Sequence, residues 1–266
     1  MRPEDAHESD ERYTGDYYAQ GEMTPALRSR IKTRLEAAGD PVSIWLKRRF
    51  FTAWLPGPER ADGVMLDVGC GAGQLMDRAR SLGWRAEGCE LSDATARAAR
   101  RKGYVVYAGD WPGTLPAARY DLVMMSNALE HLVEPGPALE AVTRALRPGG
   151  TALITLPNFG CTQAEIFGGT WWALLPPEHV WYYRSDHVTA VLEAAGMLVE
   201  SVRTRPLATG LLDPSSLRLQ WLTWREREGS VAGFGRRCAL SFFATGTAAG
   251  AVARSPLYTL ACRPRG

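Results

Sequence analysis

The stretch that decides the fold is LDVGCGAGQLM, residues 66–76. An apolar run is followed by three glycines at alternate positions, Gly69, Gly71 and Gly73, and then by a helix-like sequence. Closely spaced glycines let the backbone approach a ligand, and the first N–H groups of the following helix have no partner within that helix. The stretch therefore predicts a buried strand, a ligand-binding turn and a helix.

The glycine spacing and one carboxylate indicate the charge of the ligand. Dinucleotide-binding turns follow the pattern G-x-G-x-x-G, whereas the spacing here is G-x-G-x-G. Asp67 lies two residues before the first glycine, where it would repel a pyrophosphate but would pair with a cationic group. The pattern favours a positively charged cofactor and counts against an NAD(P)-dependent oxidoreductase.

Strand-like and helix-like segments alternate on both sides of this turn. Helical segments separate short apolar ones, and the latter occupy residues 64–69, 85–90, 104–109, 120–127 and 150–158. Such alternation predicts an α/β fold with a doubly wound, mostly parallel sheet that binds ligands at the carboxyl ends of its strands. Two helices, starting at Thr24-Pro25 and Asp40-Pro41, are expected before the turn.

The remainder of the chain predicts a lid and a closing pair of strands. Residues 159–184 form an aromatic loop, followed by a helix capped by Ser185. Strands are expected at 197–205 and 255–264, with a helical insertion between them whose least polar run is 238–253. That run is too short to span a bilayer, so a lid or core helix is favoured over a membrane-surface helix. The predicted organisation is an N-terminal helical cap segment (1–60), a core (61–205 and 255–266) and a helical insertion or lid (206–254).

Composition narrows the class of protein. A chain of 266 residues with 45% hydrophobic and 23% charged residues is typical of one globular α/β domain with additions. The net charge of +2 is spread over interspersed residues, which argues against nucleic acid as a partner. Five scattered cysteines without a C-x-x-C pair predict neither disulfides nor a metal site, and the polar N-terminus predicts a cytoplasmic protein. The oligomeric state stays open.

Several motifs together resemble those of class I S-adenosylmethionine-dependent methyltransferases. They are VMLDVGCGAGQLM (64–76), the acidic residues Glu90 and Asp110, YDLVMMSNALEHL (120–132) and LRPGGTALITLPN (146–158). The later stretch PPEHVWYYRSDHVTAVLEAAGM (176–197) is similar to the branch that includes ubiquinone-type O-methyltransferases and bacterial small-molecule methyltransferases. The resemblance implies a seven-stranded sheet whose last strand is antiparallel.

The resemblance also implies a cofactor, S-adenosylmethionine, with S-adenosylhomocysteine as its product. Asp67 would lie near the ammonium group, Glu90 would accept both ribose hydroxyls, and Asp110 would accept from the adenine amino group. Trp111 or Leu91 would pack on the adenine ring, and a Tyr-rich N-terminal segment would close over the cofactor. The complete set expected at the cofactor is Asp67, Gly69, Gly71, Gly73, Glu90, Leu91, Asp110, Trp111, Asn127 and Tyr17.

The acceptor is expected to be a small molecule that is methylated at oxygen. If the 206–254 insertion borders the acceptor pocket, an apolar or bulky acceptor is expected. The alternatives are N- or C-methylation of a natural-product or sugar intermediate, and a protein that binds the cofactor without turnover. His179, in the aromatic loop, is the candidate catalytic base; the alternative is a histidine that only hydrogen-bonds a backbone carbonyl. Glu130 and His131 are expected to cap the following helix or to bind one another. The aromatic residues expected partly in the pocket wall and partly in the core are Tyr17, Tyr18, Trp171, Trp172, Trp181, Tyr182 and Tyr183.

Overall fold

The computed structural model of the chain describes residues 55–171, 173–174, 178–204, 220–221, 224–225, 230–246 and 257–265. Almost all of the predicted N-terminal cap, including Tyr17 and Tyr18, lies outside the described residues, as does Trp172. Much of the 206–254 insertion also lies outside them.

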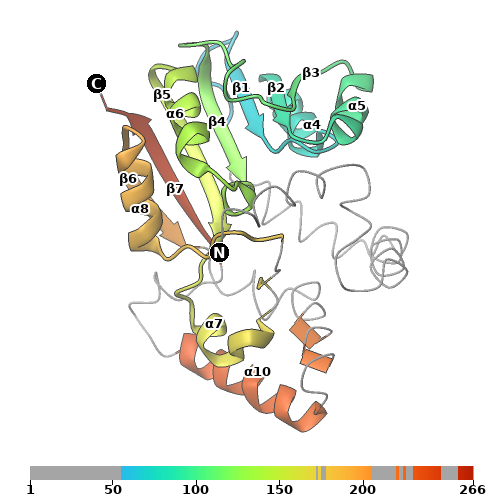
Figure 1. Cartoon of the computed structure of the whole chain (residues 1–266), viewed down its shortest axis with the longest axis vertical. Helices are drawn as coiled ribbons and strands as arrows, with labels where there is room; N and C mark the ends of the chain where they lie inside the picture. Colours follow the sequence, from blue (N-terminus) through green and yellow to red (C-terminus); the bar gives the residue numbers. More distant parts are fainter. Residues whose placement is uncertain are drawn as a thin grey trace.

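One sheet of seven strands organises the chain (Figure 1). The strands are β1 (Val64–Val68), β2 (Arg85–Glu90), β3 (Val105–Ala108), β4 (Tyr120–Ser126), β5 (Leu146–Pro157), β6 (Met197–Thr204) and β7 (Leu257–Pro264). Their order is β3-β2-β1-β4-β5-β7-β6; β7 is antiparallel to both neighbours and the other pairs are parallel. The predicted sheet, including its antiparallel closing strand, is confirmed.

Helices cover both faces of this sheet because the strand side chains alternate between two buried layers. The helices are α4 (Gln74–Ser81), α5 (Asp93–Arg101), α6 (Pro135–Ala145) and α8 (Ser185–Ala194). Along β1, Leu66 packs in the main core with α6 and α8, whereas Met65 packs with α4 on the opposite face. The sheet is therefore doubly wound, with α4 and α5 beside β1 to β3 (Figure 1).

A side-chain cap accounts for the start of one helix and is absent at another. Ser92 caps α5, because its Oγ accepts a hydrogen bond from the Thr95 N–H at 3.3 Å. The helix α8 begins at Ser185 itself, and the residue in the capping position is Arg184, without a side-chain cap. The predicted Ser185 cap is therefore wrong.

The fifth strand starts earlier than predicted. Leu146 already pairs with Tyr120, and the next pair is Leu122 with Thr151, so residues 147–150 bulge out of the ladder. A Cβ on Gly150 would lie 2.7 Å from the Tyr120 carbonyl oxygen, so only glycine fits this turn. The sequence pattern predicted this strand only over residues 150–158.

A buried ionic network ties β2 to β4. Glu87 accepts hydrogen bonds from the Tyr120 hydroxyl at 2.9 Å and the Tyr107 hydroxyl at 3.3 Å. The guanidinium of Arg119 pairs with the same carboxylate, its Nε lying at 3.1 Å. These donors, acting against the effect of burial, hold the pKa of Glu87 below its usual value.

A second, smaller core lies apart from the sheet. The helices α7 (Thr162–Phe167) and α10 (Val231–Gly246) pack together there, below the sheet in Figure 1. The aromatic loop thus contains a short helix that the sequence did not predict. Its buried members and the partly buried side chains around them are Cys161, Ala164, Phe167, Trp171, Ala173, Trp224, Ile166, Leu174, Trp221, Phe234 and Cys238.

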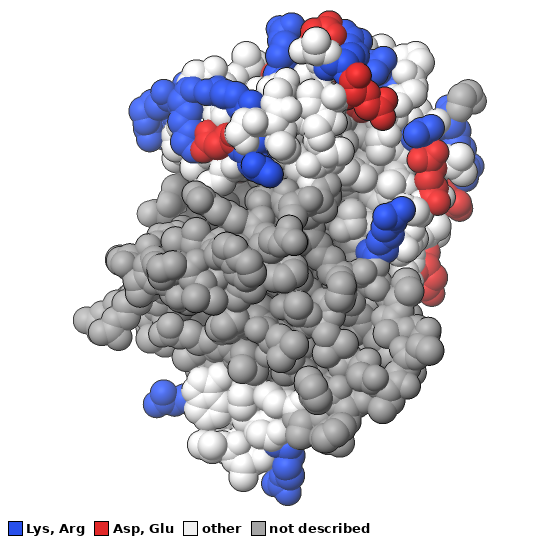
Figure 2. All heavy atoms as spheres, turned by 180° about the vertical axis from the view of Figure 1, so that it is seen from behind, with Lys and Arg blue, Asp and Glu red and all other residues white. Residues whose placement is uncertain are grey.

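Charged side chains of both signs are intermixed on the surface. The described residues on the face in Figure 2 show blue and red groups side by side rather than one continuous basic stripe. On α5, Asp93 pairs with Arg97 at 2.6 Å and with Arg100 at 2.8 Å. Within the described part of the chain, no helix has the length and apolar character needed to cross a membrane.

Candidate functional site

The glycine turn follows β1 at the point where the strand order reverses between β1 and β4. Gly69, Gly71 and Gly73 have φ values of +74°, +53° and +82°, a region that disfavours other residues. A Cβ on Gly69 would lie 3.1 Å from the Cβ of Ala128, in the turn after β4. The turn is therefore held close to the carboxyl ends of β1 and β4, where doubly wound sheets bind ligands.

Glu90, at the end of β2, stabilises this turn through hydrogen bonds. Its side chain is only 7% exposed; one carboxylate oxygen accepts from the Gly71 N–H at 2.9 Å and the other from the Ser92 N–H at 3.0 Å. Each carboxylate oxygen can accept a second hydrogen bond, so both can still receive a hydroxyl. Glu90 thus both shapes the glycine turn and presents acceptors, and the sequence predicted only the second property.

Asp67 is a buried carboxylate in β1. It is 3% exposed, and burial, followed by the nearby charge of Glu90, raises its pKa to about 8. Burial removes the water that would stabilise the ionised carboxylate. A neighbouring cation stabilises that ionised form instead. The structure thus brings Asp67, the glycines and Glu90 together, and their electrostatics suit a cationic ligand.

Other predicted cofactor residues lie around this centre. Asp110 is exposed just beyond β3, and the Gly109 N–H before it donates to the Glu90 carbonyl at 3.2 Å. Trp111 is only 2% exposed, within the main core, whereas Leu91 is partly exposed against the same core. Of the two candidates for an adenine-facing side chain, Leu91 is the more accessible. Asn127 is exposed, with a φ of +51°.

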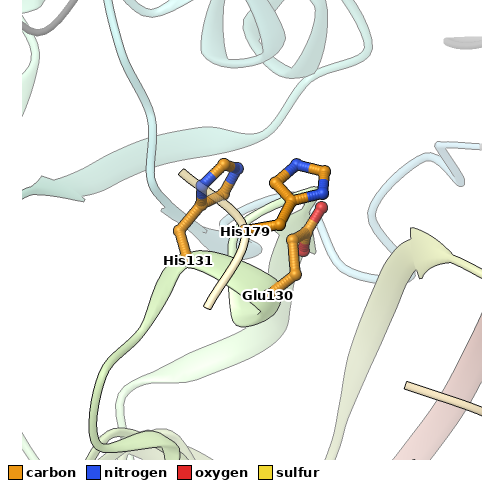
Figure 3. A group of neighbouring side chains, drawn as sticks. All are labelled: Glu130, His131 and His179. Atoms are coloured by element: carbon orange, nitrogen blue, oxygen red, sulfur yellow. The ribbon is translucent and has the colours of Figure 1, made fainter. Parts of the chain in front are cut away.

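A second group gathers at the carboxyl ends of β4 and β5 (Figure 3). Glu130 and His131 belong to the short 3-10 helix η1 (Leu129–His131) after β4, and His179 comes from the loop after β5. The N–H groups of Val180 and Trp181 donate to the Glu130 carbonyl at 2.9 and 3.2 Å. These hydrogen bonds join the aromatic loop to the turn after β4.

The two imidazoles of this group contact each other. Their ring centroids are 4.7 Å apart in an edge-to-face arrangement. His131 Nδ1 donates to the Glu178 carbonyl at 2.8 Å, and His179 Nδ1 donates to the Ala173 carbonyl at 2.8 Å. A carbonyl can only accept, so both rings carry their proton on Nδ1 and their lone pair on Nε2.

Burial controls the charge of this group. It lowers the pKa of His179, with His131 adding to the effect, to about 4, and it lowers the pKa of His131. It also raises the pKa of Glu130 to about 8. Glu130 is 1% exposed, and neither carboxylate oxygen has a hydrogen-bond partner among the described residues.

Sequence reasoning singled out His179 but missed the group around it. Among the described residues, the Glu130 carboxylate caps no helix and makes no hydrogen bond with His131, so that expectation is wrong. The available signal was an acidic residue and a histidine just after one strand, with a second histidine after the next. The carboxyl ends of neighbouring parallel strands share one edge of the sheet.

The aromatic residues of the loop divide between core and surface. Tyr183 and Trp171 are buried, whereas Trp181 is 44% exposed and its indole N–H donates to the Leu132 carbonyl at 2.9 Å. Tyr183 and Trp171 thus belong to the core, as expected for part of this set, and the expectation that others line the acceptor pocket stays a prediction.

Comparison with known proteins assigns the family. A family model described as a methyltransferase domain matches residues 45–202. Ubiquinone biosynthesis O-methyltransferases of Thiobacillus denitrificans and of a Bradyrhizobium species are 30% and 27% identical over 103 and 156 residues. These matches cover 35% and 50% of this chain, and 44% and 61% of the relatives' own lengths.

A solved structure supports the same fold. The Thermotoga maritima protein described as an S-adenosylmethionine-dependent methyltransferase, a possible histamine N-methyltransferase, superposes with a TM-score of 0.57 at 13% identity. The match covers 90% of this chain and 96% of that one. Because the family model spans more than half of the 266 residues, the chain belongs to the methyltransferase domain family, as the resemblance to class I S-adenosylmethionine-dependent enzymes predicted.

Proposed function

We propose that this protein transfers a methyl group from S-adenosylmethionine to an oxygen atom of a small molecule. The observation that carries the proposal is the joint placement of Asp67, Gly71 and Glu90. The buried acid Asp67 favours a cation and matches the ammonium group of this cofactor. The glycine turn exposes bare backbone and matches the methionine part. The Glu90 carboxylate can accept further hydrogen bonds and matches the ribose hydroxyls.

The chain's own residues would hold the cofactor as follows. Asp67 faces the ammonium group, Gly69 and Gly71 admit the methionine part, and Glu90 accepts the ribose hydroxyls. Asp110 and Leu91 take the adenine end, while Gly73 occupies the N-cap position before α4 and Asn127 faces the methionine end. When bound, the cofactor supplies a sulfonium methyl group that an acceptor can attack in line. The protein mainly positions the acceptor and excludes water.

Oxygen as the acceptor atom is supported by the relatives and by the second group of residues. The relatives compared above carry the name ubiquinone biosynthesis O-methyltransferase. His179 is neutral at physiological pH because of its low pKa, and its Nε2 lone pair could accept the hydroxyl proton. A base with a pKa near 4 is weak at neutral pH. We therefore expect its contribution to the rate to lie at the lower end of the usual range of about 100- to 10,000-fold.

Other acceptor atoms are the alternative, because one fold supports different reactions. A [4+2]-cyclase has this fold at a TM-score of 0.53 and 21% identity, beside the possible N-methyltransferase of Thermotoga maritima. α10 packs on α7, a helix of the aromatic loop, through apolar side chains, and an acceptor bound beside them would be apolar or bulky. N- and C-methylation, and binding without turnover, are outcomes that the following assays separate.

Cofactor binding is tested first. Calorimetric titration should show binding of S-adenosylmethionine and no binding of NADH. Glu90→Ala should weaken cofactor binding about ten- to hundredfold, because it removes charge-assisted contacts of about 1.5–3 kcal/mol. Glu140→Ala, an exposed acid on α6, is the matched control and should bind normally. An unchanged dissociation constant in the Glu90 variant would contradict the ribose assignment.

Turnover is tested with labelled cofactor and fractionated cell extract. The product that gains a methyl group is identified by mass and fragmentation, which distinguishes methylation at oxygen, nitrogen and carbon. On that acceptor, His179→Gln should lower the turnover number about a hundredfold with little change in cofactor affinity. Near-normal turnover of this variant would exclude His179 as the base, and methylation at carbon or nitrogen alone would overturn the oxygen assignment.

A further inference from the structure

Glu130, His131 and His179 are not among the residues assigned to the cofactor. From their geometry we propose that they bind one divalent transition-metal ion of the zinc type. Each residue offers one ligand atom, and these atoms all lie within 4.8 Å of one another. Figure 3 shows the two rings and the carboxylate gathered at one place between the turn after β4 and the aromatic loop.

The two histidines are oriented as metal ligands usually are. In metal sites, the ring nitrogen that does not bind the ion commonly donates its proton to a carbonyl or carboxylate. Here Nδ1 of each ring donates to a backbone carbonyl at 2.8 Å, that of Glu178 for His131 and that of Ala173 for His179. This bond fixes the tautomer with the lone pair on Nε2, the form that ligates a metal.

The carboxylate gives a second, independent indication. Both oxygens of Glu130 are buried without a hydrogen-bond partner in the described part of the chain, and so is the hydroxyl of Tyr183. Buried polar groups of this kind are normally satisfied, and a cation against the carboxylate would satisfy Glu130.

The donor set selects the class of ion. Two imidazole nitrogens and one carboxylate oxygen suit zinc and its neighbours, whereas magnesium and calcium prefer oxygen ligands alone. Tetrahedral ligands at about 2.0–2.1 Å from zinc lie about 3.3 Å apart, so the side chains need to close by about 1.5 Å or less. Three protein ligands leave one position open, as in catalytic zinc sites.

The metal would change the role of His179. A lone pair that ligates an ion cannot accept a proton, so the bound ion replaces His179 as the group that promotes loss of the acceptor's hydroxyl proton. This role rests on the proposed function, but the metal site itself does not. The prediction of no metal site rested on the scattered cysteines, and it could not foresee this group because Glu130 and His179 are far apart in the chain.

The test is metal binding by the full chain, with neither methyl donor nor acceptor present. The protein is stripped with a chelator and titrated with cobalt(II), whose visible absorption reports tetrahedral coordination, and with zinc(II) in competition with a chromophoric chelator. We expect one ion per chain, a tetrahedral cobalt spectrum and no displacement by excess magnesium(II). Because methyl transfer is not measured, failure of this proposal and failure of the proposed function are distinguishable.

Matched histidine variants locate the site. His179→Gln and His131→Gln should each weaken zinc binding at least about tenfold and alter the cobalt spectrum. His187→Gln replaces an exposed histidine on α8 and should bind as the unmodified chain does. Thermal unfolding without metal checks that each variant is folded, and Glu130→Gln provides a third variant. Absence of stoichiometric binding, or equal affinity in the folded ligand variants and in His187→Gln, would overturn the proposal.

Discussion

Binding of S-adenosylmethionine should tighten as the pH rises from 6.0 to 7.5, because it requires the ionised form of Asp67. The carboxyl group is buried in β1, and burial, reinforced by Glu90, raises its pKa to about 8. The free protein therefore carries a neutral Asp67 over most of this range. A cationic cofactor favours the ionised carboxylate, so binding expels a proton.

The magnitude follows from this pKa. A group with a pKa of about 8 is about 1% ionised at pH 6.0 and about a quarter ionised at pH 7.5. If the cofactor binds only the ionised form, its affinity rises about 20-fold across the range, which corresponds to about 1.8 kcal/mol. Above pH 8 the dependence should disappear.

Calorimetry tests this prediction in two ways. Dissociation constants are measured at pH 6.0, 6.5, 7.0 and 7.5. Titrations at pH 6.5 in two buffers with different ionisation enthalpies give the number of protons released, expected to be close to one per cofactor.

Asp67→Asn is the decisive variant. The amide cannot ionise, so its cofactor affinity should be lower at pH 7.5 and nearly independent of pH. A dissociation constant of the unmodified chain that varies less than twofold between pH 6.0 and 7.5 would refute the reasoning. So would an unchanged pH dependence in Asp67→Asn, because another group would then be responsible.

Further predictions concern stability and the glycine turn. Gly69→Ala should abolish measurable cofactor binding and cost about 1–3 kcal/mol of unfolding free energy, because a Cβ would strain a φ of +74° and lie 3.1 Å from a neighbouring side chain. Gly103→Ala, with a φ of +83° but open space around it, should cost about 1 kcal/mol and leave binding intact, as checked by urea unfolding and calorimetry. Tyr120→Phe should lower the unfolding free energy by about 1.5–3 kcal/mol, since it removes a donor to the buried carboxylate of Glu87; a urea midpoint equal to that of the unmodified chain would contradict this. Because the pKa of Asp67 rises from 3.8 to about 8 on folding, the native state binds more protons between pH 4 and 8, and its stability should fall as the pH increases through that window. Asp67→Asn should flatten this fall in urea unfolding at pH 5 and pH 8.

The central strands β1 and β4 could be predicted from sequence because each is a continuous run of mostly apolar residues. The second strand was predicted at 85–90 and occupies Arg85–Glu90. The glycine turn was also predictable, because alternate glycines after an apolar run favour a tight turn with positive φ values. The early start of β5 was not, because it depends on Leu146 pairing across a bulge with Tyr120.

The residues proposed to bind the cofactor are easier to bring together from sequence than the group around His179, for a physical reason. Asp67, the glycines and Glu90 lie at the ends of two consecutive strands, so the order of the chain nearly fixes their proximity. Trp111 shows the limit: its place next to Asp110 suggested a ligand contact, but the side chain lies in the main core. The group of Glu130, His131 and His179 depends on how the aromatic loop folds back, which hydrophobic periodicity does not specify.

The presence of two separate hydrophobic cores bears on how this enzyme could change its substrate. The residues expected to bind the cofactor sit on strands whose side chains fill the main core, whereas α7, Trp171 and α10 pack in the smaller core. Substitutions in the smaller core should therefore be absorbed there, without disturbing the glycine turn. On our proposal that the aromatic loop borders the acceptor, a mutagenesis library confined to residues 162–171 and 230–238 would vary acceptor preference while leaving the proposed methyl-donor site unchanged, so these segments are the starting point for redesign or evolutionary divergence of specificity.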